Sequence, residues 1–427
     1  MRDAYIISGL RSPIGKAKKG SFRFTRSDDL AAQVIQKLIK KTKGLDPNQV
    51  DDLIVGNAVP EAEQGMQMAR YISLLSLPKE VPGFIVNRYC GSGLEAIHLA
   101  ISKIKSGYAD CIIAGGTESM SMVPFLGYKS SPNYNLSKKS PDYYLNMGLT
   151  AEKLAKKYNI SREDSDLFSY NSHMKALRAI KDKKFEKEIV PINVEETIIV
   201  DSKKTTRKKT ITVDEGPRSE TTLEALSKLK PVFKFGGQVT AGNSSQMSDG
   251  SAFVVVVSEK FMKKINQSPL ARMVSYSATG VEPNIMGIGP AKAIPKALTM
   301  ADLKINNIDQ IELNEAFSSQ SLSVIKDLNL NPEIINVNGG AIALGHPLGM
   351  TGAKLSISLI NELIRNKQKY GIVTACVGGG QGVCGIFENL TLQPQQQPKF
   401  LQQYYLAKTP SQQQTLRVFL CHRKPQR

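Results

Sequence analysis

Runs of hydrophobic residues along the chain predict strands that pass directly into helices. Residues 4–9 (Ala-Tyr-Ile-Ile-Ser-Gly) are largely apolar and predict a first strand that starts close to Met1. Residues 84–89 are again mostly apolar and β-branched, whereas residues 94–104 place apolar side chains at helical spacing. A strand that gives way to a helix within a few residues is typical of an α/β fold.

A repeat in this pattern indicates two related α/β halves. Residues 50–58 (Val-Asp-Asp-Leu-Ile-Val-Gly-Asn-Ala) are similar to residues 308–316 (Ile-Asp-Gln-Ile-Glu-Leu-Asn-Glu-Ala), an offset of 258 residues. The same offset carries position 90 to position 348, which lies beside His346 at the start of another helical pattern. We therefore expect equivalent strand ends of the two halves to face each other.

Residues 121–240 break this alternation. They are rich in Tyr, Lys, Ser and Asn, and they contain helix signals at residues 147–154 and 161–166, the second with capping-box character. We predict an insertion domain that covers the functional site. Residues 391–427 are rich in Gln and have no apolar periodicity, so we predict that this tail is disordered.

Composition excludes several classes of protein. No apolar run approaches the roughly 20 residues of a membrane span. The chain has five cysteines, an odd number, and its sequence shows no secretory leader, so we expect free thiols in a reducing, cytoplasmic setting. The C-terminus is not a peroxisomal Ser-Lys-Leu signal. The net charge is +18, and six of the basic residues follow Leu392. The densest basic cluster, residues 203–209, is predicted to be a loop and has no nucleic-acid recognition motif, so we expect no nucleic-acid binding.

Cys90 lies at the junction between the predicted strand and helix. In the first turn of a helix, unpaired N–H groups and the positive end of the dipole favour a thiolate over a thiol. Gly91 and Gly93 would let a substrate carbonyl approach the backbone closely. The alternative interpretation is a buried cysteine with a structural role.

Three segments past residue 310 are unusually polar and glycine-rich for core positions. They supply an amide, a histidine before a proline, and a second cysteine leading into a glycine run, in residues 314–318, 338–347 and 376–382. Each segment alone is a weak signal. The glycine runs match neither the dinucleotide-binding fingerprint nor the phosphate-binding loop.

Six motifs, in the same order, resemble those of the thiolase family. They are Asn-Arg-Tyr-Cys-Gly-Ser-Gly (87–93), Gly-Gly-Thr-Glu-Ser-Met (115–120), Thr-Ala-Gly-Asn-Ser-Ser (240–245), Asn-Glu-Ala-Phe (314–317), Gly-Gly-Ala-Ile-Ala-Leu-Gly-His-Pro (339–347) and Cys-Val-Gly-Gly-Gly-Gln-Gly (376–382). The resemblance runs from about Ala4 to about Glu388. It implies a thiolase fold, in which two mixed five-stranded sheets enclose central helices in a five-layer αβαβα arrangement with an inserted loop domain. The expected parts are an N-terminal half (1–120 plus 241–268), a CoA-binding loop domain (121–240) and a C-terminal half (269–390).

The same resemblance implies roles for five residues. Cys90 is the expected nucleophile, and sulfur suits the reaction because the acyl enzyme is itself a thioester, so acyl exchange is nearly isoenergetic. His346 is expected to activate Cys90 and to share one oxyanion hole with a water held by Asn314. The backbone N–H groups of Cys90 and Gly378 are expected to form the other hole, and Cys376 to act as the acid and base.

Further contacts are implied less directly. Ser245 and Arg218 align with CoA contacts, and Met147, Met286 and Phe317 with residues that contact the substrate, although both methionines could equally be core filling. Asn146 stands where some relatives have a histidine. The remaining cysteines and histidines lack the spacing of metal ligands, so we expect no metal site. We expect Cys111 and Cys384 in the core and His98 and His173 in helices, while His422 belongs to the tail.

The expected activity is thiolytic cleavage of 3-ketoacyl-CoA in fatty-acid β-oxidation. CoA would be a substrate, with no tightly bound cofactor and no metal. The alternatives are a biosynthetic acetoacetyl-CoA thiolase, a decarboxylating ketoacyl synthase and a non-catalytic lipid-binding protein. Expected partners are acyl-CoA, further copies of the chain in a homodimer or tetramer, and a hydratase/dehydrogenase subunit. We expect no binding to a membrane.

Overall fold

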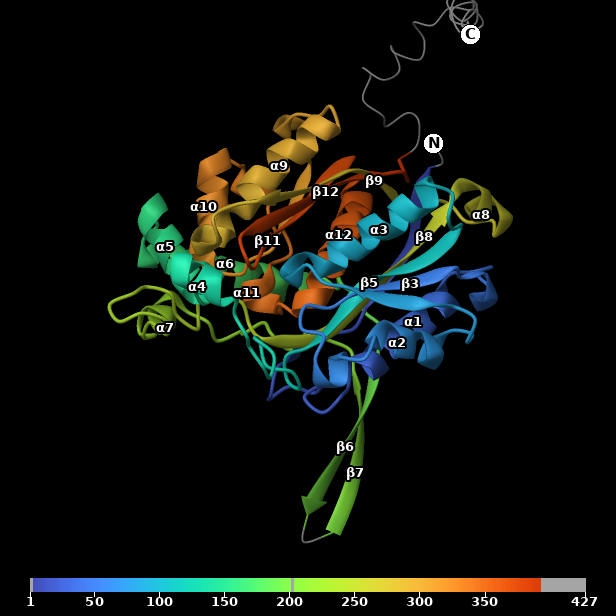
Figure 1. The fold of residues 1–427 in the computed structure, drawn as a ribbon, viewed down its shortest axis with the longest axis horizontal. Coiled ribbons are helices and arrows are strands. Elements are labelled where there is room, and N and C mark those ends of the chain that lie inside the picture. Colours follow the sequence, from blue (N-terminus) through green and yellow to red (C-terminus); the bar gives the residue numbers. More distant parts are fainter. Residues whose placement is uncertain (1–2, 201–202, 393–427) are drawn as a thin grey trace, which may run out of the picture. The chain divides into compact units, whose positions relative to one another are not determined.

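A large mixed sheet lies at the centre of the computed structural model, which describes residues 3–200 and 203–392. The strands are hydrogen-bonded in the order β10-β11-β12-β9-β1-β8-β5-β3-β4, with the short β2 also paired to β8 (Figure 1). Their bounds are β1 (Ala4–Arg11), β2 (Gly15–Lys16), β3 (Asp52–Gly56), β4 (Gly83–Val86), β5 (Cys111–Ser119), β8 (Ser248–Ser258), β9 (Ala271–Gly280), β10 (Gln310–Leu313), β11 (Tyr370–Val377) and β12 (Gln381–Asn389).

The sheet consists of two similar halves, as the repeat predicts. Parallel pairing of β3 with β5 in the first half corresponds to parallel pairing of β10 with β11 in the second. The strands of the two halves pair at one position, between Ile6 of β1 and Ala271 of β9. The two separate five-stranded sheets that we expected are thus hydrogen-bonded into a single sheet, because β1 and β9 come close enough to pair at that position.

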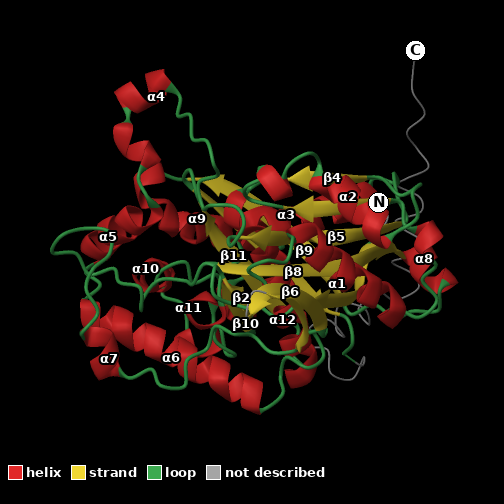
Figure 2. Ribbon diagram, turned by 90° about the horizontal axis from the view of Figure 1, so that it is seen from below, coloured by secondary structure: helices red, strands yellow, loops and turns green. Residues whose placement is uncertain are grey.

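Helices cover both faces of the strands and lie between the halves (Figure 2). The helices of the halves are α1 (Ser27–Lys41), α2 (Met68–Ser76), α3 (Ser92–Lys105), α8 (Glu259–Lys264), α9 (Gly289–Met300), α10 (Ser318–Leu328), α11 (Ala341–Leu344) and α12 (Leu348–Asn366). Along β8, Val254 and Val256 face the core shared with α3 and α12, whereas Val255 and Val257 face the core shared with α1 and α2. Every residue of β8 is buried, because helices cover it on both sides.

The C-terminal half repeats this arrangement. Val373 of β11 faces the central helices, and its neighbour Ile372 packs with α9 and α10. The layers are therefore α1 and α2, the first strand set, α3 and α12, the second strand set, and α9 and α10. This confirms the predicted five-layer αβαβα thiolase fold.

The two central helices, α3 and α12, approach each other backbone to backbone. A Cβ atom on Gly352 would lie 2.3 Å from the backbone nitrogen of Leu94, and one on Gly93 would lie 2.7 Å from the carbonyl oxygen of Gly349. Only glycine fits at such distances. This close approach brings together the N-termini of two helices that start about 256 residues apart.

The chain between β5 and β8 forms the insertion. Its elements are α4 (Tyr134–Lys139), α5 (Met147–Tyr158), α6 (Arg162–Lys181), β6 (Ile192–Val200), β7 (Lys203–Ile211) and α7 (Leu223–Ser227). Its four helices gather at one end of the sheet (Figure 2). Ser161 caps α6 in the capping box that the sequence predicts. Arg11 of β1 is fully buried and holds the insertion through Glu188 at 2.8 Å and Asp214 at 2.7 Å.

One prediction about the insertion is wrong. The basic cluster at residues 203–209 is not a loop but strand β7, which pairs antiparallel with β6 in a hairpin that projects from the sheet (Figure 1). The β-branched residues of β6 supply the pairing partner, and Glu195 pairs with Lys208 at 2.9 Å. The predicted disordered tail, apart from Thr391 and Leu392, lies outside the described residues.

We expect Gly352→Ala to destabilise the protein. Alanine adds about 1 kcal/mol of helix propensity, but its methyl group would overlap the backbone of Leu94. Overpacking against an atom that cannot move aside gives a net loss of about 1–3 kcal/mol. The measurement is the urea midpoint of unfolding, and the control is Gly280→Ala, where nothing lies within 4 Å of the added carbon. An unchanged midpoint in Gly352→Ala would contradict the helix contact.

Candidate active site

Cys90 lies in a 3-10 turn, Tyr89–Gly91, that leads directly into α3. Tyr89 has a φ of +41°, which is uncommon for a bulky residue and is held by its neighbours. Its N–H donates to Asn87 Oδ1 at 2.9 Å, and its carbonyl accepts from Ser92 Oγ at 2.7 Å. Two side chains therefore maintain the strained turn that presents Cys90, and the turn occurs where the strand-to-helix pattern predicts it.

The electrostatic surroundings of Cys90 oppose ionisation. Burial raises the pKa of the Cys90 thiol to about 12, and the negative charge of Glu118 adds to the increase. The N–H groups of Gly378 and of Cys90 itself point at the sulfur and act in the opposite direction. The expected preference for a thiolate is therefore wrong for the free enzyme, because desolvation outweighs the helix terminus.

His346 precedes α12 and is oriented by two polar side chains. Its Nδ1 lies 2.6 Å from Thr351 Oγ1, and the Thr351 hydroxyl donates to the Pro347 carbonyl at 2.9 Å. Since that hydroxyl proton is already used, Nδ1–H is the donor to threonine and Nε2 carries the lone pair. Nε2 accepts from Asn314 Nδ2 at 3.3 Å. Burial lowers the pKa of His346 to about 4, so the imidazole is neutral at physiological pH.

Cys376 lies near the end of β11 and is fully buried. Burial raises the pKa of this thiol well above its ordinary value, and the charge of an ionised Cys90 raises it further. The two sulfurs, 286 residues apart in sequence, thus lie close enough to influence each other. Two residues before Cys376, the Thr374 carbonyl accepts from the N–H of Asn314 at 2.9 Å. Leu348, close to His346, packs in one apolar cluster with Cys90.

The glycine run after Cys376 forms the turn from β11 to β12. Gly379 and Gly380 have φ values of +80° and +85°, and a Cβ on Gly380 would lie 2.3 Å from the Val281 carbonyl oxygen. Glycine is required at these two positions. At Gly378 the nearest atom to an added Cβ is 3.6 Å away, on Tyr89, so packing leaves room there. Gly378 contacts the Cys90 sulfur through its backbone N–H.

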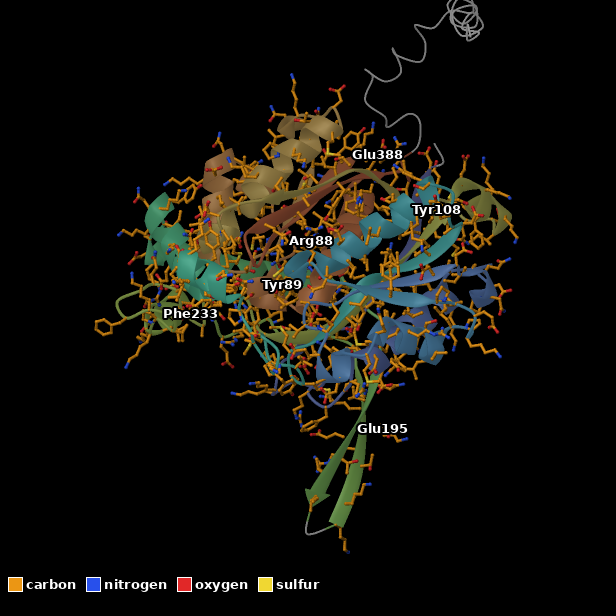
Figure 3. All side chains as sticks on the ribbon, in the orientation of Figure 1. Arg88, Tyr89, Tyr108, Glu195, Phe233 and Glu388 are labelled. Carbon is orange, nitrogen blue, oxygen red and sulfur yellow. The ribbon has the colours of Figure 1, made fainter. Side chains whose placement is uncertain are left out.

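The predicted acyl-contact residues cluster around Cys376. Met286 and Phe317 are buried with it in one apolar group, against which Met147 and Phe233 pack. The rings of Phe233 and Phe317 meet edge to face, with centroids 6.0 Å apart. Phe233 comes from the insertion, where it is labelled in Figure 3. The structure thus brings all three predicted side chains to the second sulfur.

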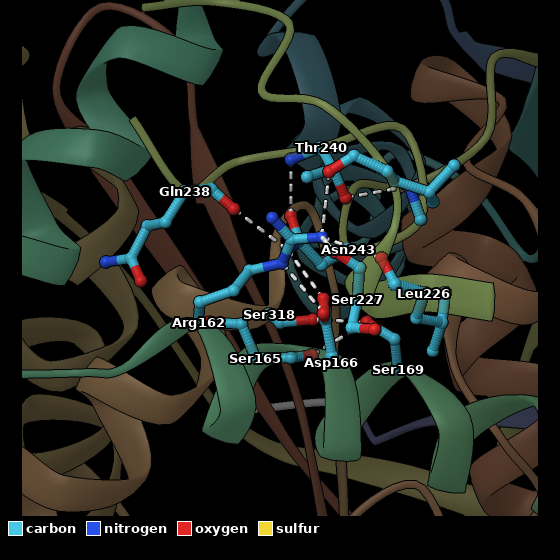
Figure 4. Close-up of polar contacts among 12 residues, drawn as sticks. Arg162, Ser165, Asp166, Ser169, Leu226, Ser227, Gln238, Thr240, Asn243 and Ser318 are labelled. Atoms are coloured by element: carbon cyan, nitrogen blue, oxygen red, sulfur yellow. Dashed lines mark hydrogen bonds and ion pairs between the residues drawn. The ribbon is translucent and has the colours of Figure 1, made fainter. Parts of the chain in front are cut away.

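Ser245 belongs to a loop that is anchored to the insertion and to α10. Its N–H donates to the Ala316 carbonyl at 2.9 Å. Figure 4 shows the anchoring contacts, in which Asn243 Nδ2 donates to Asp166 Oδ1 of α6 at 3.1 Å. Asp166 in turn pairs with Arg162 Nε at 2.7 Å. The loop is therefore fixed next to the Asn314 segment.

Other candidates have different surroundings. Arg218 is exposed, and its backbone N–H donates to His173 Nδ1 at 3.2 Å. Burial, assisted by Arg218, lowers the pKa of His173 to about 4. Asn146 caps α5 by accepting from the N–H of Gly148 at 2.9 Å, which gives this position a structural use.

The remaining cysteines and His98 are structural in the described part of the chain. Cys111 and Cys384 are buried in strands, as predicted, and His98 of α3 stacks on Tyr276 with centroids 4.0 Å apart. Within residues 3–200 and 203–392 no group of three metal-ligating side chains occurs. Those residues also include no helix long and apolar enough to cross a membrane.

Sequence reasoning missed two buried groups beside the site. Thr351 orients His346, and Glu118 accepts from the N–H groups of Ala58 at 2.8 Å and Gly349 at 2.9 Å. Burial raises the pKa of Glu118. The only sequence signal for Glu118 is its place in the 115–120 motif, and none marks Thr351, because its partner is defined by the turn at Pro347.

Two family models together match most of the chain. Residues 4–260 match the model "Thiolase, N-terminal domain", and residues 267–389 match "Thiolase, C-terminal domain". Among curated proteins, the 3-ketoacyl-CoA thiolase of Bacillus subtilis is 50% identical over 390 residues, covering 91% of this chain and all of the relative. A probable acetyl-CoA acyltransferase of Staphylococcus aureus is 40% identical, with coverage of 90% and 99%.

Solved structures agree with this result. The chain is similar to the Bacillus anthracis acetyl-CoA acetyltransferase, with a TM-score of 0.83, and to human mitochondrial 3-ketoacyl-CoA thiolase, with a TM-score of 0.82. Each is 38% identical, and each comparison covers 91% of this chain and 99% of the other.

We expect alkylation of Cys90 to accelerate with pH without levelling off below pH 9. Because the pKa of the thiol is raised to about 12, the thiolate fraction grows about tenfold per pH unit throughout that range. The measurement is the rate of iodoacetamide addition by intact mass in a Cys421→Ser background. The control is Cys90→Ser in the same background. It should remain unmodified, because Cys111, Cys376 and Cys384 are buried. A plateau below pH 8 would show that the resting residue is already a thiolate.

Proposed function

The chain belongs to the thiolase family and is an acyltransferase, and we propose that it cleaves 3-ketoacyl-CoA with CoA to give acetyl-CoA and a shortened acyl-CoA. One observation carries this proposal. The backbone N–H groups of Cys90 and Gly378 point at the Cys90 sulfur, and Cys376 lies close enough for its pKa to depend on the charge of Cys90. One sulfur can hold the acyl group while the other handles protons. The 3-ketoacyl-CoA thiolase relative supports the choice of substrate.

In the first half-reaction, Cys90 attacks the 3-keto carbon of the substrate. Its proton passes to Nε2 of His346, which holds a lone pair because Nδ1–H is bonded to Thr351. The negative charge that forms on the keto oxygen is met by the N–H groups of Cys90 and Gly378. The bond between the second and third carbons then breaks, leaving an acyl group on Cys90 and the enolate of acetyl-CoA.

Cys376 provides the proton for that enolate and becomes a thiolate. The raised pKa of Cys376 suits this role, because its thiolate is a strong base that can also remove a proton from the weak carbon acid in the reverse direction. In the second half-reaction the Cys376 thiolate takes the proton of CoA. The CoA sulfur attacks the acyl group, and Cys90 leaves and regains its proton from His346.

Asn314 and His346 are proposed to stabilise the enolate oxygen. Asn314 Oδ1 is buried and accepts no hydrogen bond from the described residues, so it can orient a water toward that oxygen. His346 Nε2 lies 3.3 Å from the Asn314 side chain, which makes the two groups parts of one site. Removing a donor of this kind typically costs about 2.7–4 kcal/mol in the transition state.

We propose that residues 121–240 form the CoA-binding domain between an N-terminal half (1–120 plus 241–268) and a C-terminal half (269–390). The fixed loop at Ser245 supports a contact with the pantetheine arm, and the exposed guanidinium of Arg218 a contact with the nucleotide end. Met147, Met286 and Phe317 would contact the acyl chain beside Cys376. CoA is then a substrate, and no resident cofactor is needed.

Acetoacetyl-CoA synthesis is the second candidate, since one solved neighbour is an acetyl-CoA acetyltransferase. Turnover as a function of 3-ketoacyl chain length separates the two reactions. The cluster of Met147, Met286 and Phe317 favours longer chains, because its side chains are apolar and two are flexible. A ketoacyl synthase or a non-catalytic lipid-binding protein would leave the buried Cys376 without a role.

A homodimer in the cytoplasm is the proposed assembly, and a hydratase/dehydrogenase subunit of β-oxidation is a further proposed partner. Within the described residues, β4 has a strand neighbour on one side only, and α2 beside it exposes Tyr71, Leu74 and Leu75. An unpaired edge next to exposed apolar side chains is typical of an interface.

We expect an acyl group to be trapped on Cys90. Intact-mass analysis after mixing with 3-ketoacyl-CoA should show one acyl adduct, and peptide mapping should place it on residue 90. In Cys376→Ala the steady-state thiolysis should fall by at least about 100-fold, because the enolate loses its proton donor. The Cys384→Ala variant, which removes another buried thiol, is the control. An adduct on a different residue would overturn the assignment.

For the assembly, light scattering should give about twice the monomer mass of 46.8 kDa. Leu74→Lys should shift the protein toward monomer, because it places charge in the apolar surface of α2. Tyr108→Lys, at an exposed residue after α3, is the control. A monomeric wild-type protein would exclude the dimer, and a fourfold mass would indicate the tetramer.

A further inference from the structure

The two donors aimed at the Cys90 sulfur belong to different halves of the fold. The N–H of Cys90 belongs to the turn before α3, and the N–H of Gly378 belongs to the turn between β11 and β12. Small movements between these turns would separate the donors. A catalytic geometry built from two halves therefore needs a brace between the turns.

Arg88 supplies such a brace. It lies two residues before Cys90 in the sequence, and Figure 3 labels it together with its neighbour Tyr89. Its Nη1 donates to Gln381 Oε1 at 2.8 Å, and Gln381 lies three residues after Gly378. Its Nε donates to Glu95 of α3 at 2.5 Å. One planar guanidinium group thus joins the nucleophile turn, the first turns of α3 and the glycine turn of the other half.

The carboxylate that holds Arg88 is itself fixed by the C-terminal half. Glu95 is buried and also accepts a hydrogen bond from the hydroxyl of Tyr276 on β9. The ring of Tyr276 is held by its stack on His98 of α3. Because every member of this group is oriented by another, the brace is rigid although Arg88 is partly exposed.

We propose that Arg88 is a positioning residue, which aligns the Cys90 and Gly378 N–H groups through its paired contacts with Glu95 and Gln381. This inference rests on the proposed acyl transfer to Cys90. The charge of Arg88 is not the means of action. The pKa of Cys90 is set by its burial, by the two N–H groups and by the charge of Glu118, and Arg88 does not contribute to it.

The experiment measures acyl-enzyme formation by rapid quench and intact mass in the full-length protein. Arg88→Met and Gln381→Met each break the contact between the turns from a different end, with side chains of similar length. We expect each to slow acylation about tenfold to a hundredfold, with KM little changed, since misplaced groups weaken only the transition state. Arg88→Lys should not restore the rate, because one ammonium group cannot reproduce the fork.

Two further measurements separate this role from others. Arg272→Met is the matched control, because Arg272 pairs with Glu388 at 2.7 Å across the far ends of β9 and β12, where Glu388 is labelled in Figure 3. It should acylate at the wild-type rate. The pH dependence of Cys90 alkylation should be the same in the wild type, Arg88→Met and Gln381→Met.

Three results would overturn the proposal. They are normal acylation in Gln381→Met, rescue by Arg88→Lys together with a shifted alkylation profile, and a loss of rate in Arg272→Met equal to that in Arg88→Met. The second would indicate a role for charge, and the third a general loss of stability. Absence of any acyl adduct in the wild type would instead contradict the proposed function, independently of Arg88.

Discussion

The close contact between α3 and α12 is the constraint on which the site depends. Gly93, Gly349 and Gly352 let two helix N-termini meet at distances that a single methyl group would prevent. Cys90 lies just before α3 and His346 just before α12, so the contact brings the chain segments that hold the thiol and the imidazole together, one from each half. Each half alone would lack one of them.

Burial then sets the chemistry of these groups. Desolvation keeps both thiols protonated and the imidazole neutral, so the resting site carries no ion pair between them. In the mechanism that we propose, charge forms only during the reaction, and the N–H groups of Cys90 and Gly378 already lie at the sulfur where the acyl group would bind. Preorganised donors of this kind act strongly because they do not have to rearrange when the charge appears.

Polar anchors join the separate parts of the fold around this centre. Arg11 ties β1 to the insertion through Glu188 and Asp214, and the loop at Asn243 ties the insertion to α10. Buried arginine–carboxylate pairs cost desolvation energy and are maintained only with good geometry. Their position between segments distant in sequence indicates that they fix orientation, so that Met147 and Phe233 of the insertion reach the apolar cluster at Cys376.

Much of the fold and the candidate site could be predicted from local pattern. The strand-to-helix junction at Cys90, the capping box at Ser161 and the repeat between residues 50–58 and 308–316 depend on short-range periodicity or direct similarity, and the structure agrees with each. Local pattern failed for residues 203–209, because a basic strand is recognised only through its partner β6.

The sequence by itself determined which residues are chemically able to act and in which elements they lie. Only the tertiary structure decided their ionisation, the tautomer of His346 and the joining of the strands through Ile6 and Ala271. The helix terminus at Cys90 suggested a thiolate, but the surrounding core makes the thiol the stable form. The physical reason is that desolvation and hydrogen-bond partners arise from atoms far apart along the chain, which no local pattern contains.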